Sequence, residues 1–301
     1  MRNPFEKAKT WWVRYSDYQW RTSKDGVLYI QPAPGATFTL YNAMEVMEQL
    51  VIDALNAGRK LMGKEPKEDS KPIIMDFVRK YGLLGMMTAL PTTPKFMDYE
   101  MVYLPKNRFI KEEQLHTEQF LLNFFPFEKP HLMKSGKSYA CSVSGDNRLM
   151  ALSATFSDYP LAVTLSFMPE YAERFDWIVT QLKDWMFLVT TCEFFYDPDY
   201  QLMANAEEQR TLLRQAMNAF SGNAPTYHIA LFEDAPALVW DFHSLMLAIT
   251  LVFSFMLTDT DNPIHMCKNC GKVFIAEKQG SLFCSAECKT QYRAQKKQEK
   301  K

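Results

Sequence analysis

Four of the six cysteines lie within 22 residues near the C-terminal end, and they form two close pairs. The spacing is Cys267-x2-Cys270, then 13 residues, then Cys284-x3-Cys288. Thiolates are soft ligands that zinc prefers, and two pairs joined by a short loop can complete a tetrahedron of four sulfurs. The sequence therefore predicts one structural zinc ion, bound by all four cysteines. A closed tetrahedron leaves no position for water, so no catalytic role is expected for this metal.

Two disulfides and a redox-active Cys-x2-Cys pair are the competing interpretations. The first residues contain no continuous apolar segment, so no secretory signal is expected, and the protein is predicted to be cytoplasmic, where thiols stay reduced. A redox pair would leave the second cysteine pair unexplained. His265 lies two residues before Cys267 and is a possible substitute ligand, although four cysteines already fill the tetrahedron. Cys141 and Cys192 stand alone in apolar surroundings and are expected to be small buried residues.

The residues around the four cysteines predict the elements that position them. Gly271 follows Cys270 directly and allows the chain to turn back with a positive φ. Residues 272–275 are expected to form a short strand, and residues 277–280 a turn. Ser285 is a good N-cap for a helix over residues 286–298, which consists of strong helix formers. A knuckle, a hairpin and a helix that carries the last ligand together make a treble-clef-like finger.

The segment MCKNCGKVFIAEKQGSLFCSAECKTQYRAQKK resembles the CGNR-type zinc finger that ends many uncharacterised bacterial proteins, some of which carry an ABATE-type N-terminal domain. The shared features are Cys-x2-Cys-Gly-x2-Phe, the step Phe283-Cys284-Ser285 and a basic helix after Cys288. The Gly-Asn-Arg that gives the family its name is missing after the last cysteine, where Lys289-Thr290-Gln291 stands. The resemblance covers the finger and leaves the rest of the chain unassigned. It implies a DNA-binding, regulator-like role in a bacterium.

The charge of the chain is divided unevenly between its two parts. Residues 265–301 contain nine Lys or Arg and three Asp or Glu, a formal charge of +6, whereas the first 264 residues carry −7. Five basic residues recur at spacings of three and four after the last cysteine, which places most of them on one face of a helix. These predicted nucleic-acid contacts are Lys289, Arg293, Lys296, Lys297 and Lys300. The alternatives are docking of the finger and basic tail on an acidic protein partner, and a solvated terminal tail.

Residues 1–260 are predicted to form a mainly helical, α+β body, and residues 261–301 a separate zinc finger, with a polar linker over 258–263. The expected helices cover 42–62, 70–82, 111–123, 169–195, 203–220 and 236–258. The expected short strands cover 27–31, 37–41, 100–104, 151–156, 161–167 and 226–232. The aromatic and arginine-rich segment 11–21 is expected to lie in the core rather than to stack on bases.

The sequence contains no motif typical of a phosphate-binding loop, a dinucleotide site, a serine hydrolase or a zinc protease. Asp241 and His243 are two residues apart in a predicted helix, so they are expected on different faces and not as an acid–base pair. The longest apolar run, residues 245–257, is too short to cross a bilayer, which needs about 20 residues. We therefore expect neither an enzyme nor a membrane protein, with an enzyme of unfamiliar type as the third hypothesis. The body's ligand and the oligomeric state are left open.

Overall fold

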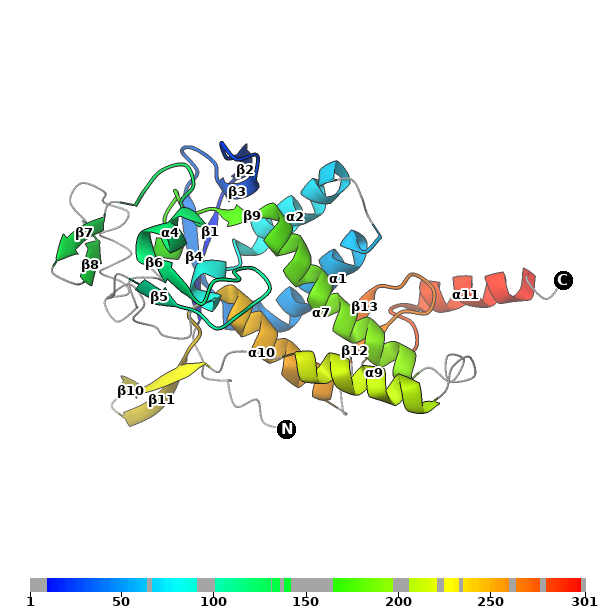
Figure 1. The fold of residues 1–301 in the computed structure, drawn as a ribbon. Helices are drawn as coiled ribbons and strands as arrows, with labels where there is room; N and C mark the ends of the chain where they lie inside the picture. Colours follow the sequence, from blue (N-terminus) through cyan, green and yellow to red (C-terminus); the bar gives the residue numbers. More distant parts are fainter. Residues whose placement is uncertain are drawn as a thin grey trace. The chain divides into compact units, whose positions relative to one another are not determined.

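The structure is a computed structural model (Figure 1). It describes residues 10–63, 67–90, 101–130, 132–135, 138–141, 165–196, 206–220, 225–232, 235–259, 264–276 and 280–298. Long helices are combined with short antiparallel strand pairs. The predicted mainly α, α+β fold class is confirmed.

The chain divides into two compact units, each assembled from three segments. The first unit contains Met1–Val46, Met75–Ile178 and Asn223–Ala248, and the second contains Met47–Ile74, Val179–Gly222 and Ile249–Lys301. The cysteine-rich segment belongs to the second unit, together with helical segments that are distant from it in the sequence. The separate finger that the sequence predicts from residue 261 onward stays a prediction.

The first unit contains the strands β1 to β11, which pair in antiparallel fashion as β1–β4, β2–β3–β9, β5–β6, β7–β8 and β10–β11. The strands are β1 (Trp11–Tyr15), β2 (Tyr18–Thr22), β3 (Leu28–Pro32), β4 (Phe38–Asn42), β5 (Met101–Tyr103), β6 (Gln114–His116), β7 (Leu132–Ser135), β8 (Ser138–Cys141), β9 (Glu173–Arg174), β10 (Thr226–Phe232) and β11 (Ala235–Asp241). Its short helices are η1 (Ala43–Val46), α3 (Met86–Ala89) and α4 (Thr117–Leu122).

A buried carboxylate organises the core of the first unit. Glu173 is fully buried and accepts hydrogen bonds from the backbone N–H groups of Leu84 and Met86, at 2.9 and 2.8 Å. The hydroxyl of Tyr171 donates a third hydrogen bond to it, at 2.8 Å. Burial raises the pKa of Glu173 above its usual value, while these hydrogen bonds oppose the shift. The carboxylate thus fixes the turn that follows the second long helix of the chain.

The second unit contains the finger and most of the helical residues. Its elements are α1 (Met47–Leu61), α9 (Ala206–Ala219), β12 (Ile264–Met266), β13 (Val273–Ile275) and α11 (Ala286–Gln298). Three further helices, α2 (Lys67–Tyr81), α7 (Phe175–Tyr196) and α10 (Leu245–Thr258), are divided between the two units. In α1 the buried apolar residues Leu50, Ala54 and Leu61 recur at helical spacing and form its core-facing side.

Three predicted helices are corrected by strand pairing. Residues 235–241 form β11 rather than the start of a helix, because they pair along their whole length with β10. Ser244 then caps α10, accepting a hydrogen bond from the N–H of Leu247 at 3.0 Å. The helices expected to start at residues 111 and 169 begin at Thr117 and Phe175, after β6 and β9.

Among the other predicted elements, the expected strand 161–167 is wrong where the structure describes it, because residues 165–167 form a helical turn; the rest are confirmed or lie outside the described residues. The expected strand 226–232 matches β10, and the expected helices 42–62, 70–82 and 203–220 match α1, α2 and α9 to within five residues. The expected strand 151–156 and residues 260–263 of the expected linker lie outside the described residues. Within the described part of the chain, no helix combines the length and the apolar character needed to span a membrane.

Candidate metal centre

The first cysteine pair lies in the loop of a short hairpin. Strand β12 pairs antiparallel with β13, and the loop between them is closed by two backbone hydrogen bonds. The N–H of Cys267 donates to the carbonyl of Lys272 at 2.9 Å, and the N–H of Gly271 donates to the carbonyl of Cys267 at 2.8 Å. Gly271 has a φ of 68°, in the left-handed region that favours glycine, as predicted. The loop therefore places Cys267 and Cys270 next to each other.

The second cysteine pair is placed by a backbone contact and by a helix cap. The N–H of Lys268 donates to the carbonyl of Leu282 at 3.0 Å, which brings the second segment beside the first. The Ser285 hydroxyl oxygen accepts a hydrogen bond from the N–H of Cys288 at 3.2 Å, so Ser285 is the N-cap of α11. Cys284 precedes the helix and Cys288 lies in its first turn. The predicted cap and the predicted bounds of the helix are confirmed.

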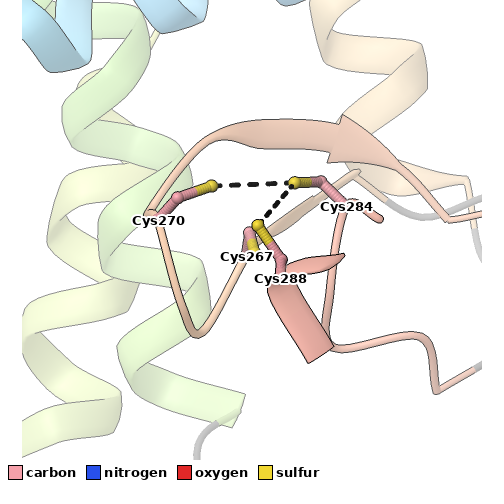
Figure 2. A group of neighbouring side chains, drawn as sticks. All are labelled: Cys267, Cys270, Cys284 and Cys288. Carbon is pink, nitrogen blue, oxygen red and sulfur yellow. Dashed lines mark hydrogen bonds between the residues drawn. The ribbon is translucent and has the colours of Figure 1, made fainter. Parts of the chain in front are cut away.

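All four sulfurs converge on one point (Figure 2). They lie within 4.8 Å of one another, and the Sγ of Cys284 is 3.6 Å from the Sγ atoms of both Cys270 and Cys288. A disulfide requires about 2.05 Å, so these four cysteines are free thiols. Cys267 is buried, whereas Cys270 is exposed, so the cluster has one side in the protein and one side toward solvent. The four cysteines can hold a metal ion.

The thiols of the cluster differ in pKa. Burial acts to raise the pKa of Cys267, but hydrogen bonds from the backbone of Cys270, Cys284 and Asn269 lower it to about 6. Burial and the neighbouring cysteines raise the pKa of Cys284 to about 12. Burial also raises the pKa of Cys270 above the usual value of a thiol. A cation at the centre would stabilise the thiolates and so oppose the effect of burial, which is the main reason that these protons are hard to remove.

The remaining candidate ligands lie elsewhere. His265 is not part of the sulfur cluster, and its Nδ1 lies 2.9 Å from the Oε1 of Glu193. Cys192 is half-buried, and burial raises the pKa of its thiol to about 11, which fits an unreactive residue. The side chain of Cys141 lies outside the described residues.

Two contacts define which side of α11 faces the rest of the finger. The amide of Asn269 donates to the Oε1 of Gln291 at 2.9 Å. The rings of Phe283 and Tyr292 lie 5.2 Å apart between centroids. The side of α11 that carries Gln291 and Tyr292 is therefore in contact with the two cysteine loops. None of the residues of α11 is buried, and the helix leads away from the β12–β13 hairpin (Figure 1).

The predicted basic residues lie on a different side of α11. At about 100° per residue, the four described ones fall within an arc of about 100°, centred roughly opposite Gln291. They are Lys289, Arg293, Lys296 and Lys297, and all four are exposed. The ammonium of Lys296 lies 5.3 Å from the centroid of the Tyr292 ring. Lys300 lies outside the described residues.

The aromatic segment near the N-terminus belongs to the core of the first unit, as expected. Trp12, Tyr15 and Tyr18 are buried, and the indole N–H of Trp12 donates to the carbonyl of Leu83 at 2.8 Å. No base-stacking surface is formed by these three rings. Asp241 ends a strand and His243 precedes a helix, so the expectation that both lie on one helix is wrong.

Sequence reasoning missed two side chains that hold the hairpin of the finger. Asn56 on α1 bonds the backbone of Val273, and Glu193 on α7 bonds the backbone of Met266. Asn56 is 217 positions from its partner, and no local pattern in either segment indicates the pairing.

No family model, curated protein or solved structure matches this chain.

Proposed function

We propose that the four cysteines bind zinc and that the zinc finger presents the basic side of α11 to nucleic acid. Zinc–sulfur bonds of about 2.3 Å arranged as a tetrahedron place sulfurs about 3.8 Å apart. The two sulfur–sulfur distances of 3.6 Å are close to that value. Zinc bound by four thiolates has a closed coordination sphere, so its role is to hold the two loops and the start of α11 together.

The main support for a contact with nucleic acid is the position of the basic side chains on α11. Lys289, Arg293 and Lys297 form no ion pair with any residue that the structure describes, and they lie away from the cysteine loops. The only acidic residue of α11 is Glu287 in the first turn. A helix of 13 residues is about 20 Å long, which is enough to follow several phosphates.

The charge of the finger supports the same contact after the metal is included. Four thiolates and one Zn²⁺ together contribute −2, so the formal +6 of residues 265–301 becomes about +4. The −7 of the first 264 residues repels phosphates. Any contact with nucleic acid is therefore expected through the finger rather than through the rest of the chain.

The resemblance to CGNR-type fingers is consistent with this proposal. It rests on the two cysteine pairs, on Gly271 and Phe274, and on the Phe283-Cys284-Ser285 step. We infer a regulator of bacterial type, located in the cytoplasm, in which the rest of the chain senses a ligand or forms a dimer. Direct reading of base pairs is less favoured than phosphate contact, because Arg293 is the one arginine on the basic side of α11.

The second candidate is docking of α11 on an acidic protein. The same exposed basic side supports it, and both interactions weaken with salt. Competition with an excess of unrelated duplex DNA separates them. The DNA displaces a labelled nucleic-acid ligand, whereas it leaves an acidic protein bound if α11 recognises that protein and does not bind DNA.

The test is binding of labelled random-sequence DNA and RNA to the zinc-loaded full chain, measured by fluorescence polarisation. Four phosphate contacts at about 0.9 counterion each predict a slope of about −3.6 in a plot of log affinity against log salt. The triple variant Arg293→Ala/Lys296→Ala/Lys297→Ala should bind more weakly, with a slope near −1, and should keep its zinc.

The matched control removes three positive charges from exposed lysines of the first unit. The variant Lys24→Ala/Lys111→Ala/Lys129→Ala should keep the wild-type slope. Absence of DNA and RNA binding by the wild type at about 50 mM salt, where phosphate contacts are strongest, would exclude the nucleic-acid proposal. Docking on an acidic protein would then be the better account of the finger.

A further inference from the structure

Strand β13 is held on α1 by the side-chain amide of Asn56. The Nδ2 of Asn56 donates to the carbonyl of Val273 at 3.0 Å, and its Oδ1 accepts from the N–H of the same residue at 2.9 Å. Nδ2 also donates to the carbonyl of Ile52, one turn earlier in α1, at 2.9 Å. Asn56 and Val273 are both buried. The amide therefore supplies the two hydrogen bonds that a neighbouring strand would make to Val273.

Strand β12 is held on α7 by a carboxylate. The Oε1 of Glu193 accepts a hydrogen bond from the N–H of Met266 at 3.1 Å and lies 2.9 Å from the Nδ1 of His265. The hydroxyl of Thr190, one turn earlier in α7, lies 4.0 Å from the sulfur of Met266. Cys267 directly follows these residues, so the contact with Glu193 lies next to the first metal ligand.

The two helices that hold the hairpin are themselves in close contact. Gly58 of α1 lies against the backbone of α7, where a Cβ on this residue would overlap the carbonyl oxygen of Leu182. Asn56 precedes Gly58 by two residues, and Glu193 follows Leu182 by three turns of α7. Each strand of the hairpin is thus attached to a different helix of one packed pair.

We propose that Asn56 and Glu193 are positioning residues for the metal centre, which fasten the metal-bound hairpin to α1 and α7 so that metal binding and hairpin docking stabilise each other. This inference rests on metal binding by the four cysteines, and it does not depend on contact with nucleic acid. If the coupling holds, the metal ion stabilises the packed pair of α1 and α7 as well as the finger.

The physical basis is that the hairpin and the side chain of Asn56 both lose stabilising contacts when they separate. The strands of the hairpin have three residues each, too few to persist without the metal or the helices. If the hairpin unfolds, the buried amide of Asn56 loses its two hydrogen bonds to the backbone of Val273. Two events that stabilise each other are coupled reciprocally, so weakening the docking must also weaken metal binding.

The first test is the zinc affinity of the full chain, measured by competition with a colorimetric chelator. Loss of the two hydrogen bonds to Val273 in Asn56→Ala should weaken zinc binding by roughly 10- to 30-fold. Gln49→Ala is the matched control, because Gln49 is an exposed amide on the same helix. It should bind zinc like the wild type.

The second test is a double-mutant cycle with a variant that lacks two ligands, Cys270→Ser/Cys284→Ser. In the zinc-loaded wild-type background, Asn56→Ala should shift the urea midpoint of the helical transition downward. In the ligand-deficient background the same substitution should shift the urea midpoint much less, because the hairpin that Asn56 binds is already detached from α1. A residue that only supports the packing of α1 would give equal shifts in both backgrounds.

Hydrogen exchange on the unmodified protein keeps the proposal testable if Asn56→Ala fails to fold. Removal of zinc should increase exchange at the amides of α1 by at least tenfold, while exchange in the β2–β3 ladder of the first unit stays unchanged. Unchanged exchange in α1, or equal zinc affinity of wild type and Asn56→Ala, would overturn the coupling and leave the zinc site intact. Absence of bound zinc from the wild type would overturn the zinc site and the coupling together.

Discussion

Zinc affinity should increase steeply with pH. Binding requires thiolates, and at pH 7 to 8 the thiols of Cys270 and Cys284 carry protons, since burial raises the pKa of both and that of Cys284 reaches about 12. The zinc-bound state therefore holds at least two protons fewer than the zinc-free state. Affinity should rise about 100-fold per pH unit in this range, which is a slope of at least two in log affinity against pH.

The slope should become steeper in acid. The hydrogen bonds from backbone groups that lower the pKa of Cys267 to about 6, against the effect of burial, keep this thiol ionised at neutral pH. Below pH 6 its proton must be displaced as well, so the slope should increase by about one. The stability that zinc confers is consequently present at neutral and alkaline pH and is lost progressively as the pH falls.

The assay is competition for zinc between the full chain and a chelator of known proton affinity, from pH 5 to pH 8. The variant Cys284→Ser is the internal comparison, because it removes one of the two protonated ligands and should lower the slope at pH 7 to 8 by about one. A wild-type slope of one or less at pH 7 to 8 would refute the four-thiolate assignment, since it would mean that Cys270 or Cys284 does not bind the metal.

Three further predictions concern stability. Gly58→Ala should lower the free energy of unfolding by about 1–2 kcal/mol, because overlap with the carbonyl of Leu182 outweighs the gain in helix propensity; urea unfolding measures the loss. Ser285→Ala removes the hydroxyl that caps α11 at the N–H of Cys288, which should lower stability by about 1 kcal/mol. The loss should appear as a lower temperature for the loss of helical circular dichroism, whereas Ser285→Thr should retain most of the stability. Glu173→Gln places an amide N–H₂ against one of the two buried backbone N–H donors and should cost about 2–3 kcal/mol in urea unfolding. An unchanged urea midpoint would show that the buried carboxylate is not needed.

The finger was predictable from the sequence because its structure is set by neighbouring residues. The cysteine spacing, the glycine that needs a positive φ at position 271, and the cap at Ser285 all act within a few residues. The predicted helix 286–298 accordingly coincides with α11. These local features place the sulfurs within each pair, and the backbone contact between Lys268 and Leu282 then brings the two pairs together.

Elements that depend on distant partners were missed or misassigned. Strand β9 consists of two residues that pair with β3, where Ile30 faces Glu173, and no pattern around residue 173 distinguishes them from the helix that follows. Residues 236–241 have enough apolar character to continue the helix after them, but pairing with β10 determines their conformation. Asn56 stands in an amphipathic helix, where sequence alone gives no sign of the strand that it binds.

The amide of Asn56 also covers the outer backbone edge of β13. Without α1, the outer backbone groups of β13 would be exposed as an unpaired strand edge, which is a template for pairing with a second chain. A fragment that contains residues 264–301 alone would keep its cysteines but present this edge to solvent. Such a fragment is expected to aggregate or to form strand-paired dimers even when it is loaded with zinc, which makes the intact chain the appropriate material for study of the finger.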